Sequence, residues 1–126
     1  MTSRLTHVDR DLDELLRTAE PRTRMAGGLS ASQVAIRVCN VTMPSDADSA
    51  TDRHAYAASL DKVYFDLNDA GDDRAQGAFA AARAATSSAF AADGRAEEAV
   101  YEAIVATGDL TLVRAHVLAV VRDLTS

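Results

Sequence analysis

Side chains that commonly do chemistry are few and scattered in this sequence. The histidines stand at positions 7, 54 and 116, and Cys39 is the single cysteine. No histidine has another histidine four residues away, and the Glu-x-x-His pairs that hold metals in helical bundles are absent. A cysteine becomes nucleophilic beside a base or a cation, so an isolated thiol is most simply buried and unreactive. We therefore expect no metal, no cofactor and no enzymatic activity.

One short acidic segment matches part of a calcium-binding pattern. Asp66, Asn68 and Gly71 have the residue types of the first, third and sixth positions of an EF-hand loop, and the segment resembles the start of such a loop. The fifth and twelfth positions are Ala70 and Gly77, so two ligand positions are empty. A helix that ends at a glycine, flanked by solvated aspartates, accounts for the segment.

The best candidates for a protein interface lie in and before an alanine-rich stretch at residues 75 to 92. Alanine on nearly every face of a helix lets another backbone approach closely, and Phe79 and Phe90 supply anchors about three turns apart. The aspartates before this stretch form an acidic corner that suits a basic partner. The predicted interface residues are Phe79, Ala82, Phe90, Asp69, Asp72 and Asp73.

A second set of residues suggests contact with DNA. Residues 29 to 38 resemble the second helix of a helix-turn-helix domain and the approach to it, with Ala35 as the small residue that packs on the recognition helix. The resemblance implies a DNA-binding regulator that uses residues 22 to 55, with Arg22, Arg24, Ser32, Gln33 and Arg37 at the DNA. Two features depart from the pattern of that family. Cys39 and Asn40 stand where the turn glycine is common, and the aspartates at 46, 48 and 52 would repel the phosphates of DNA.

Charge and composition restrict the function classes further. The net charge is −6, and residues 45 to 126 carry 14 acidic against 7 basic side chains, which disfavours nonspecific nucleic-acid binding by that part. Lys62 is the only lysine in an alanine-rich chain, as GC-rich bacterial coding bias produces. The sequence shows neither a secretory signal nor an apolar stretch long enough to cross a bilayer. We therefore expect a cytoplasmic protein that does not enter membranes.

The second half of the chain is predicted to be helical. Tyr56, Leu60, Val63, Tyr64 and Leu67 repeat at helical spacing up to Gly71. Further helices are expected over residues 73 to 93, 96 to 107 and 109 to 124, because Gly94 and Gly108 punctuate them and Asp109 has the residue type of an N-cap.

The first half is less regular. A helix capped by Thr6 is expected to bury Val8, Leu12, Leu15 and Ala19 and to stop before Pro21. A basic loop with Arg22, Arg24, Gly27 and Gly28 follows. Ser30 and Gln33 then form a capping box that favours a helix over residues 30 to 42, although the alternation of Val34, Ile36 and Val38 is that of a strand.

These elements predict one all-α domain of five or six helices over residues 1 to 126. Residues 50 to 126 are expected to form an antiparallel four-helix bundle, because the connections are short, and the helical pair of residues 1 to 44 docks on it. The preferred function is a cytosolic, non-enzymatic protein interaction module that self-associates. The alternatives are the DNA-binding regulator and a bundle that binds a small molecule between its helices.

Overall fold

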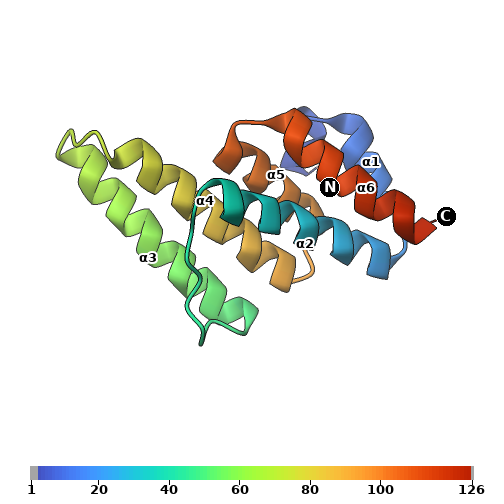
Figure 1. The fold of residues 1–126 in the computed structure, drawn as a ribbon, viewed down its shortest axis with the longest axis horizontal. Helices are drawn as coiled ribbons and strands as arrows, with labels where there is room; N and C mark the ends of the chain where they lie inside the picture. Colours follow the sequence, from blue (N-terminus) through green and yellow to red (C-terminus); the bar gives the residue numbers. More distant parts are fainter. Residues whose placement is uncertain (1–2, 126) are drawn as a thin grey trace.

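The chain folds into helices only, over the whole range that can be described. The structure is a computed structural model, and it describes residues 3–125. Within that range there is no strand, and the prediction of an all-α fold with five or six helices is confirmed. The elements, labelled in Figure 1, are a short 3-10 helix η1 (Arg4–His7) and the helices α1 (Arg10–Thr18), α2 (Pro21–Val38), α3 (Ala50–Asp69), α4 (Ala75–Ala92), α5 (Ala96–Thr107) and α6 (Leu110–Thr125).

Helices α2 to α6 form a packed bundle on which η1 and α1 dock. Helix α2 packs against α4, α5 and α6, and η1 and α1 lie against α5. Helix α2 was expected to dock from outside, whereas it lies within the bundle. Helix α3 packs extensively along α4 alone, and the ends of the two helices that are joined by residues 70–74 extend away from the other helices, while the rest of α4 packs on α2 and α5 (Figure 1).

The predicted basic loop at residues 22 to 28 is wrong, because these residues form the first half of α2. Pro21 occupies the first turn of that helix, where its missing N–H is not needed. Gly28 allows a close approach, since a Cβ added there would lie 3.0 Å from the Cα of Ala96. At Gly27 an added Cβ would lie 2.9 Å from Cδ2 of Leu16. The two glycines are therefore contact points between helices. The strand alternative for Val34 to Val38 is also wrong.

This packing leads to a prediction about stability. Gly28→Val should lower the free energy of unfolding by about 2 kcal/mol, because the branched side chain would meet the backbone of α5. Gly77→Ala is the matched control, since an added Cβ there meets nothing within 4 Å. It should raise the free energy of unfolding by about 0.5 to 1 kcal/mol. Urea denaturation checks both values, and a harmless Gly28→Val would contradict the close packing of α2 on α5.

The start of the chain differs from the expected single helix. Asp9, and not Thr6, caps α1, because its carboxylate accepts a hydrogen bond from the backbone N–H of Leu12 at 3.0 Å. The Nη1 of Arg114 on α6 donates to the same carboxylate at 2.8 Å. The chain therefore turns between η1 and α1, and Val8 is exposed at the turn.

The connections in the second half follow the predicted glycines. Gly71, Gly94 and Gly108 have φ values of 66°, 77° and 65°, the left-handed region in which a side chain is strained. Asp109 caps α6, as predicted, by accepting from the backbone N–H of Leu112. Helix α4 begins at Ala75, two residues after the expected position.

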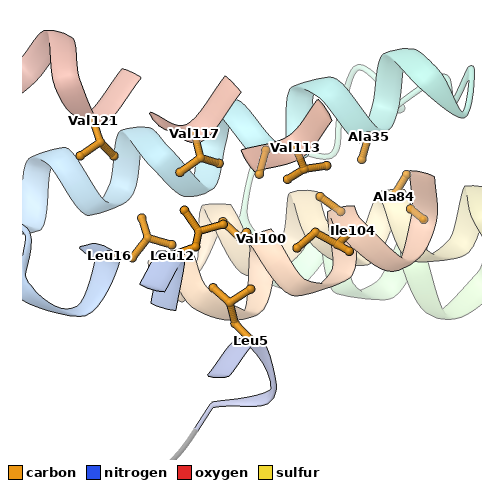
Figure 2. Close-up of a cluster of buried hydrophobic side chains, with 13 residues drawn as sticks. Leu5, Leu12, Leu16, Ala35, Ala84, Val100, Ile104, Val113, Val117 and Val121 are labelled. Atoms are coloured by element: carbon orange, nitrogen blue, oxygen red, sulfur yellow. The ribbon is translucent and has the colours of Figure 1, made fainter. Parts of the chain in front are cut away.

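The hydrophobic core lies between α2 and the helices that pack around it. Leucines of η1 and α1 meet valines of α5 and α6 at its centre (Figure 2). Its members include Leu5, Leu12, Leu16, Ala35, Ala84, Val100, Ile104, Val113, Val117 and Val121. This cluster contains no residue of α3. Helix α3 is therefore attached to the fold by α4 and not by the core.

Candidate functional site

Helix α3 has an unusual burial pattern for a long helix. It runs for 20 residues, and Ala57 is its one buried residue. Its side chains toward the far end include Val63 and Phe65, which are 48% and 58% exposed. A helix of a monomeric protein normally buries an apolar stripe, so α3 leaves apolar surface without a partner in its own chain.

Three aromatic rings gather where α3 and α4 extend from the bundle. The centroids of Tyr64 and Phe65 are 5.3 Å apart, and those of Tyr64 and Phe79 are 5.1 Å apart. Phe79 is 37% exposed although it lies between two helices. We call Tyr64, Phe65 and Phe79 the aromatic cluster. It holds the two helices together and leaves two phenylalanines facing solvent.

A groove of about 550 Å³ lies beside the aromatic cluster. Helix α4 contributes Phe79 and three neighbours, α3 contributes Tyr64 and Asn68, and the end of α5 closes the far side. The lining residues are Tyr64, Asn68, Ala75, Gln76, Phe79, Ala80, Val105, Ala106, Thr107 and Gly108. None of them is charged, so the groove suits an apolar group with few polar contacts.

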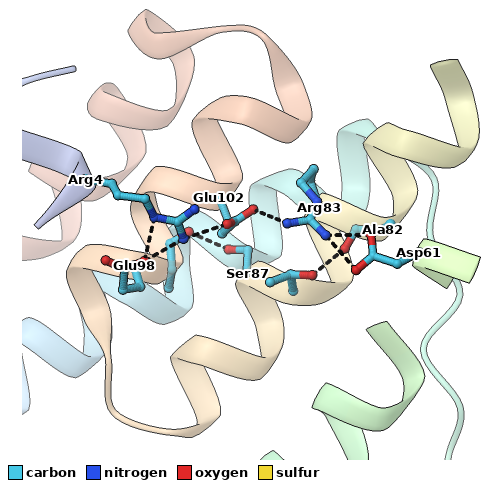
Figure 3. Close-up of polar contacts among 9 residues, drawn as sticks. Arg4, Asp61, Ala82, Arg83, Ser87, Glu98 and Glu102 are labelled. Carbon is cyan, nitrogen blue, oxygen red and sulfur yellow. Dashed lines mark hydrogen bonds and ion pairs between the residues drawn. The ribbon is translucent and has the colours of Figure 1, made fainter. Parts of the chain in front are cut away.

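Helices α3 and α4 form an antiparallel hairpin, and a chain of charged side chains links this hairpin to α5 and to the start of the chain (Figure 3). Arg83 on α4 donates through Nη2 to both carboxylate oxygens of Asp61 on α3, at 2.6 and 2.8 Å. Its Nη1 donates at 3.1 Å to Glu102 on α5, whose side chain is only 2% exposed. Glu102 thus links the hairpin to the centre of the molecule.

The same network reaches the start of the chain. The Nη2 of Arg4 donates to Glu102 at 2.8 Å and to Glu98 at 2.6 Å, and its guanidinium lies 4.4 Å from the ring centre of Tyr101. Desolvation is the largest single influence on the pKa of Arg4 and lowers it, but the hydrogen bonds to both glutamates raise the pKa overall. Glu98 keeps some contact with solvent, whereas Glu102 is buried.

The predicted interface residues are only partly brought together. Phe79 is exposed in the groove, but Ala82 is fully buried within the chain and touches no free surface. Phe90 is half-buried near the other end of α4, with the His54 ring at 5.3 Å and the Arg95 guanidinium at 4.9 Å. The sequence prediction missed Phe65, although an aromatic residue outside the apolar stripe of a helix is a recognisable signal.

The acidic corner is solvated. Asp72 pairs with Arg74 at 2.8 Å, and the hydrogen bonds from Arg74 lower the pKa of Asp72 to about 2. Asp69 and Asp73 are exposed. Over residues 3–125 no group of three or more histidines, cysteines, aspartates or glutamates is placed to hold a metal ion.

The residues expected at DNA lie along one continuous helix. Arg22, Gln33 and Arg37 are exposed, but Ser32 is buried and donates to the backbone oxygen of Leu29. Arg24 lies 3.6 Å from Glu97. Residues 39–49 separate α2 from α3, so the short turn of a helix-turn-helix motif is not formed there.

Two other features offer little chemistry. A polar hollow of about 560 Å³ near α1 is lined by three arginines, but three acidic side chains balance their charge: Arg10, Arg17 and Arg24 against Asp13, Glu14 and Glu97. Cys39 donates through Sγ to the backbone oxygen of Ala106 at 3.4 Å, and burial raises the pKa of its thiol. Burial thus disfavours the thiolate form that a nucleophilic cysteine uses.

Two further observations concern membranes and known proteins. Within residues 3–125, no helix is long and apolar enough to cross a bilayer. No family model, no curated protein and no solved structure matches this chain.

Proposed function

We propose that this protein is a non-enzymatic interaction module that self-associates through the α3–α4 hairpin. The observation that carries the proposal is the exposure of Phe65 and Val63 on a helix that adds no residue to the core cluster. Large apolar side chains that are grouped on a projecting element lose unfavourable contact with water when a partner covers them.

A second apolar strip on α3 supports this function. Leu60, Val63 and Leu67 follow the i, i+3, i+7 spacing that places residues on one face of a helix. Phe65 points elsewhere, because residues two apart on an α-helix differ by about 200° in direction. Leu60 and Leu67 are half-buried and Val63 is exposed, so the strip is only partly covered by α4. The hairpin therefore offers apolar groups on more than one side.

The setting of this module is the reducing cytosol. A single cysteine gives no disulfide framework, and the chain relies on helix packing and buried ion pairs instead. Its net charge of −6 keeps separate copies apart at long range, so that association depends on the apolar hairpin rather than on nonspecific attraction.

Phe65→Asp is expected to weaken self-association at least tenfold while the fold is retained, because the substituted side chain is exposed in the monomer. The measurement is light scattering after size exclusion over a range of protein concentrations, with circular dichroism as the test of folding. Met25→Asp is the matched control, since Met25 is 55% exposed on α2 and lies beside Arg53, Ala91 and Ala92, at the opposite end of the hairpin from Phe65.

Three outcomes separate the alternatives. A monomer at every concentration would refute self-association, and equal weakening by Met25→Asp would place the contact on α2. The same experiment with a short DNA duplex at low salt tests the DNA-binding alternative. A mass increase that needs DNA and is lost in an Arg22→Ala, Arg37→Ala variant would replace our proposal.

A further inference from the structure

The geometry points to a second copy of this chain, running antiparallel along α3, as the partner that covers the exposed side of that helix around Phe65. In this arrangement the Phe65 rings of the two copies meet at the twofold axis, beside the groove of each hairpin. The inference rests on the proposed function, because it specifies the partner and the orientation of the same surface.

The first support is the position of Phe65 relative to the groove. Phe65 contacts Tyr64, and the other ring neighbour of Tyr64 is Phe79, which lines the groove. A projecting ring therefore lies immediately beside an uncharged hollow. A twofold axis uses the same patch on both subunits, so the two Phe65 rings can cover each other, with the hollow of each copy at the edge of the contact.

The second support is charge complementarity along α3. Lys62 precedes Phe65 by three residues and Asp69 follows it by four, so all three lie on one side of the helix. When two such helices run antiparallel with their Phe65 side chains at the twofold axis, Lys62 of each copy faces Asp69 of the other. Both side chains are exposed, and neither forms an ion pair within residues 3–125.

The third support is size. Helices of this length are about 30 Å long and 10 Å wide, so one face of the hairpin spans about 600 Å². Stable complexes bury roughly 600 to 1,000 Å² on each partner, so one face of the hairpin is large enough for a second copy.

The test exchanges the two charges between separate copies. Lys62→Asp alone places two pairs of aspartates face to face in the dimer, and Asp69→Lys alone places two pairs of lysines face to face. Each variant should self-associate about tenfold more weakly than the original chain. Mixed in equal amounts, the two variants should form a heterodimer close to the original affinity, because both opposed pairs are then of opposite sign. Glu14→Lys, an exposed substitution on α1 with the same change in charge as Asp69→Lys, is the control and should neither weaken association nor pair with Lys62→Asp.

The outcomes distinguish this inference from the function on which it rests. Association that is weakened by Phe65→Asp, without any preference for the mixed pair, would refute the antiparallel arrangement and leave the hairpin as the contact. An original chain that stays monomeric would refute both. Light scattering and mass spectrometry of the intact complex measure how much of the mixed pair forms. Preferential formation of that pair would show that Lys62 of one copy lies opposite Asp69 of the other.

Discussion

Val117→Asp is expected to lower the free energy of unfolding by several kcal/mol. Val117 is fully buried on α6, and one of its methyl groups lies 3.5 Å from where a Cβ would stand at Gly27. No cation of the core cluster is available to pair with a new carboxylate there. Burying an unpaired charge costs several kcal/mol, and a domain of this size has about 5 to 15 kcal/mol of total stability. Circular dichroism with urea denaturation measures the loss.

Ala119→Asp is the matched control for that substitution. Ala119 lies two residues later on the same helix and is exposed, so the same chemical group enters water instead of the core. The expected loss is less than about 1 kcal/mol, which reflects the lower helix propensity of aspartate. Equal losses at the two positions would mean that α6 presents a different face to the core.

Glu102→Leu is expected to lower the free energy of unfolding by about 3 to 5 kcal/mol. The carboxylate of Glu102 is buried and receives hydrogen bonds from Arg4 and Arg83. Arg83 already has one buried nitrogen, Nε, with no hydrogen-bond partner in the described structure. Without Glu102 it would lose its link to α5 and retain only Asp61 as a charged partner. Urea denaturation again gives the measurement.

A double substitution distinguishes the unpaired charge from lost packing. Arg83→Met combined with Glu102→Leu should recover much of the loss, since apolar residues of similar volume often replace a buried ion pair without cost. Glu97→Leu is the single control, because Glu97 lies at 3.6 Å from Arg24 near the surface, and should cost less than about 1 kcal/mol. A double variant as unstable as Glu102→Leu would show that the shape of Glu102, rather than its charge, is what the site requires.

The sequence predicted helices best where local signals and tertiary packing agree. Gly94 and Gly108 end helices because the left-handed backbone favours glycine, and Asp109 caps the next helix through its own side chain. The prediction failed at Gly27 and Gly28, where glycine usually indicates a loop. There the small residues serve contacts with α1 and α5, which no local pattern reveals.

The candidate site was also predictable only where local signals were sufficient. Phe79 was expected to be an anchor, and it lies exposed in the groove. Ala82 was grouped with it by helical spacing, yet α4 turns that position inward. The role of Glu102 depends on arginines 19 residues before it on α4 and 98 residues before it at the start of the chain. Ion pairs between residues so far apart in the sequence form only in the assembled fold, and sequence spacing does not predict them.

The core cluster extends from Leu5 to Val121, so its halves come from opposite ends of the polypeptide. During synthesis on the ribosome, η1, α1 and α2 therefore emerge long before the valines of α6 that cover them. Contacts between such distant segments require closure of a long loop, which slows folding and delays it until the last helix is available. The hairpin occupies the middle of that loop. Its exposed phenylalanines are thus present on the nascent chain while the core is still open.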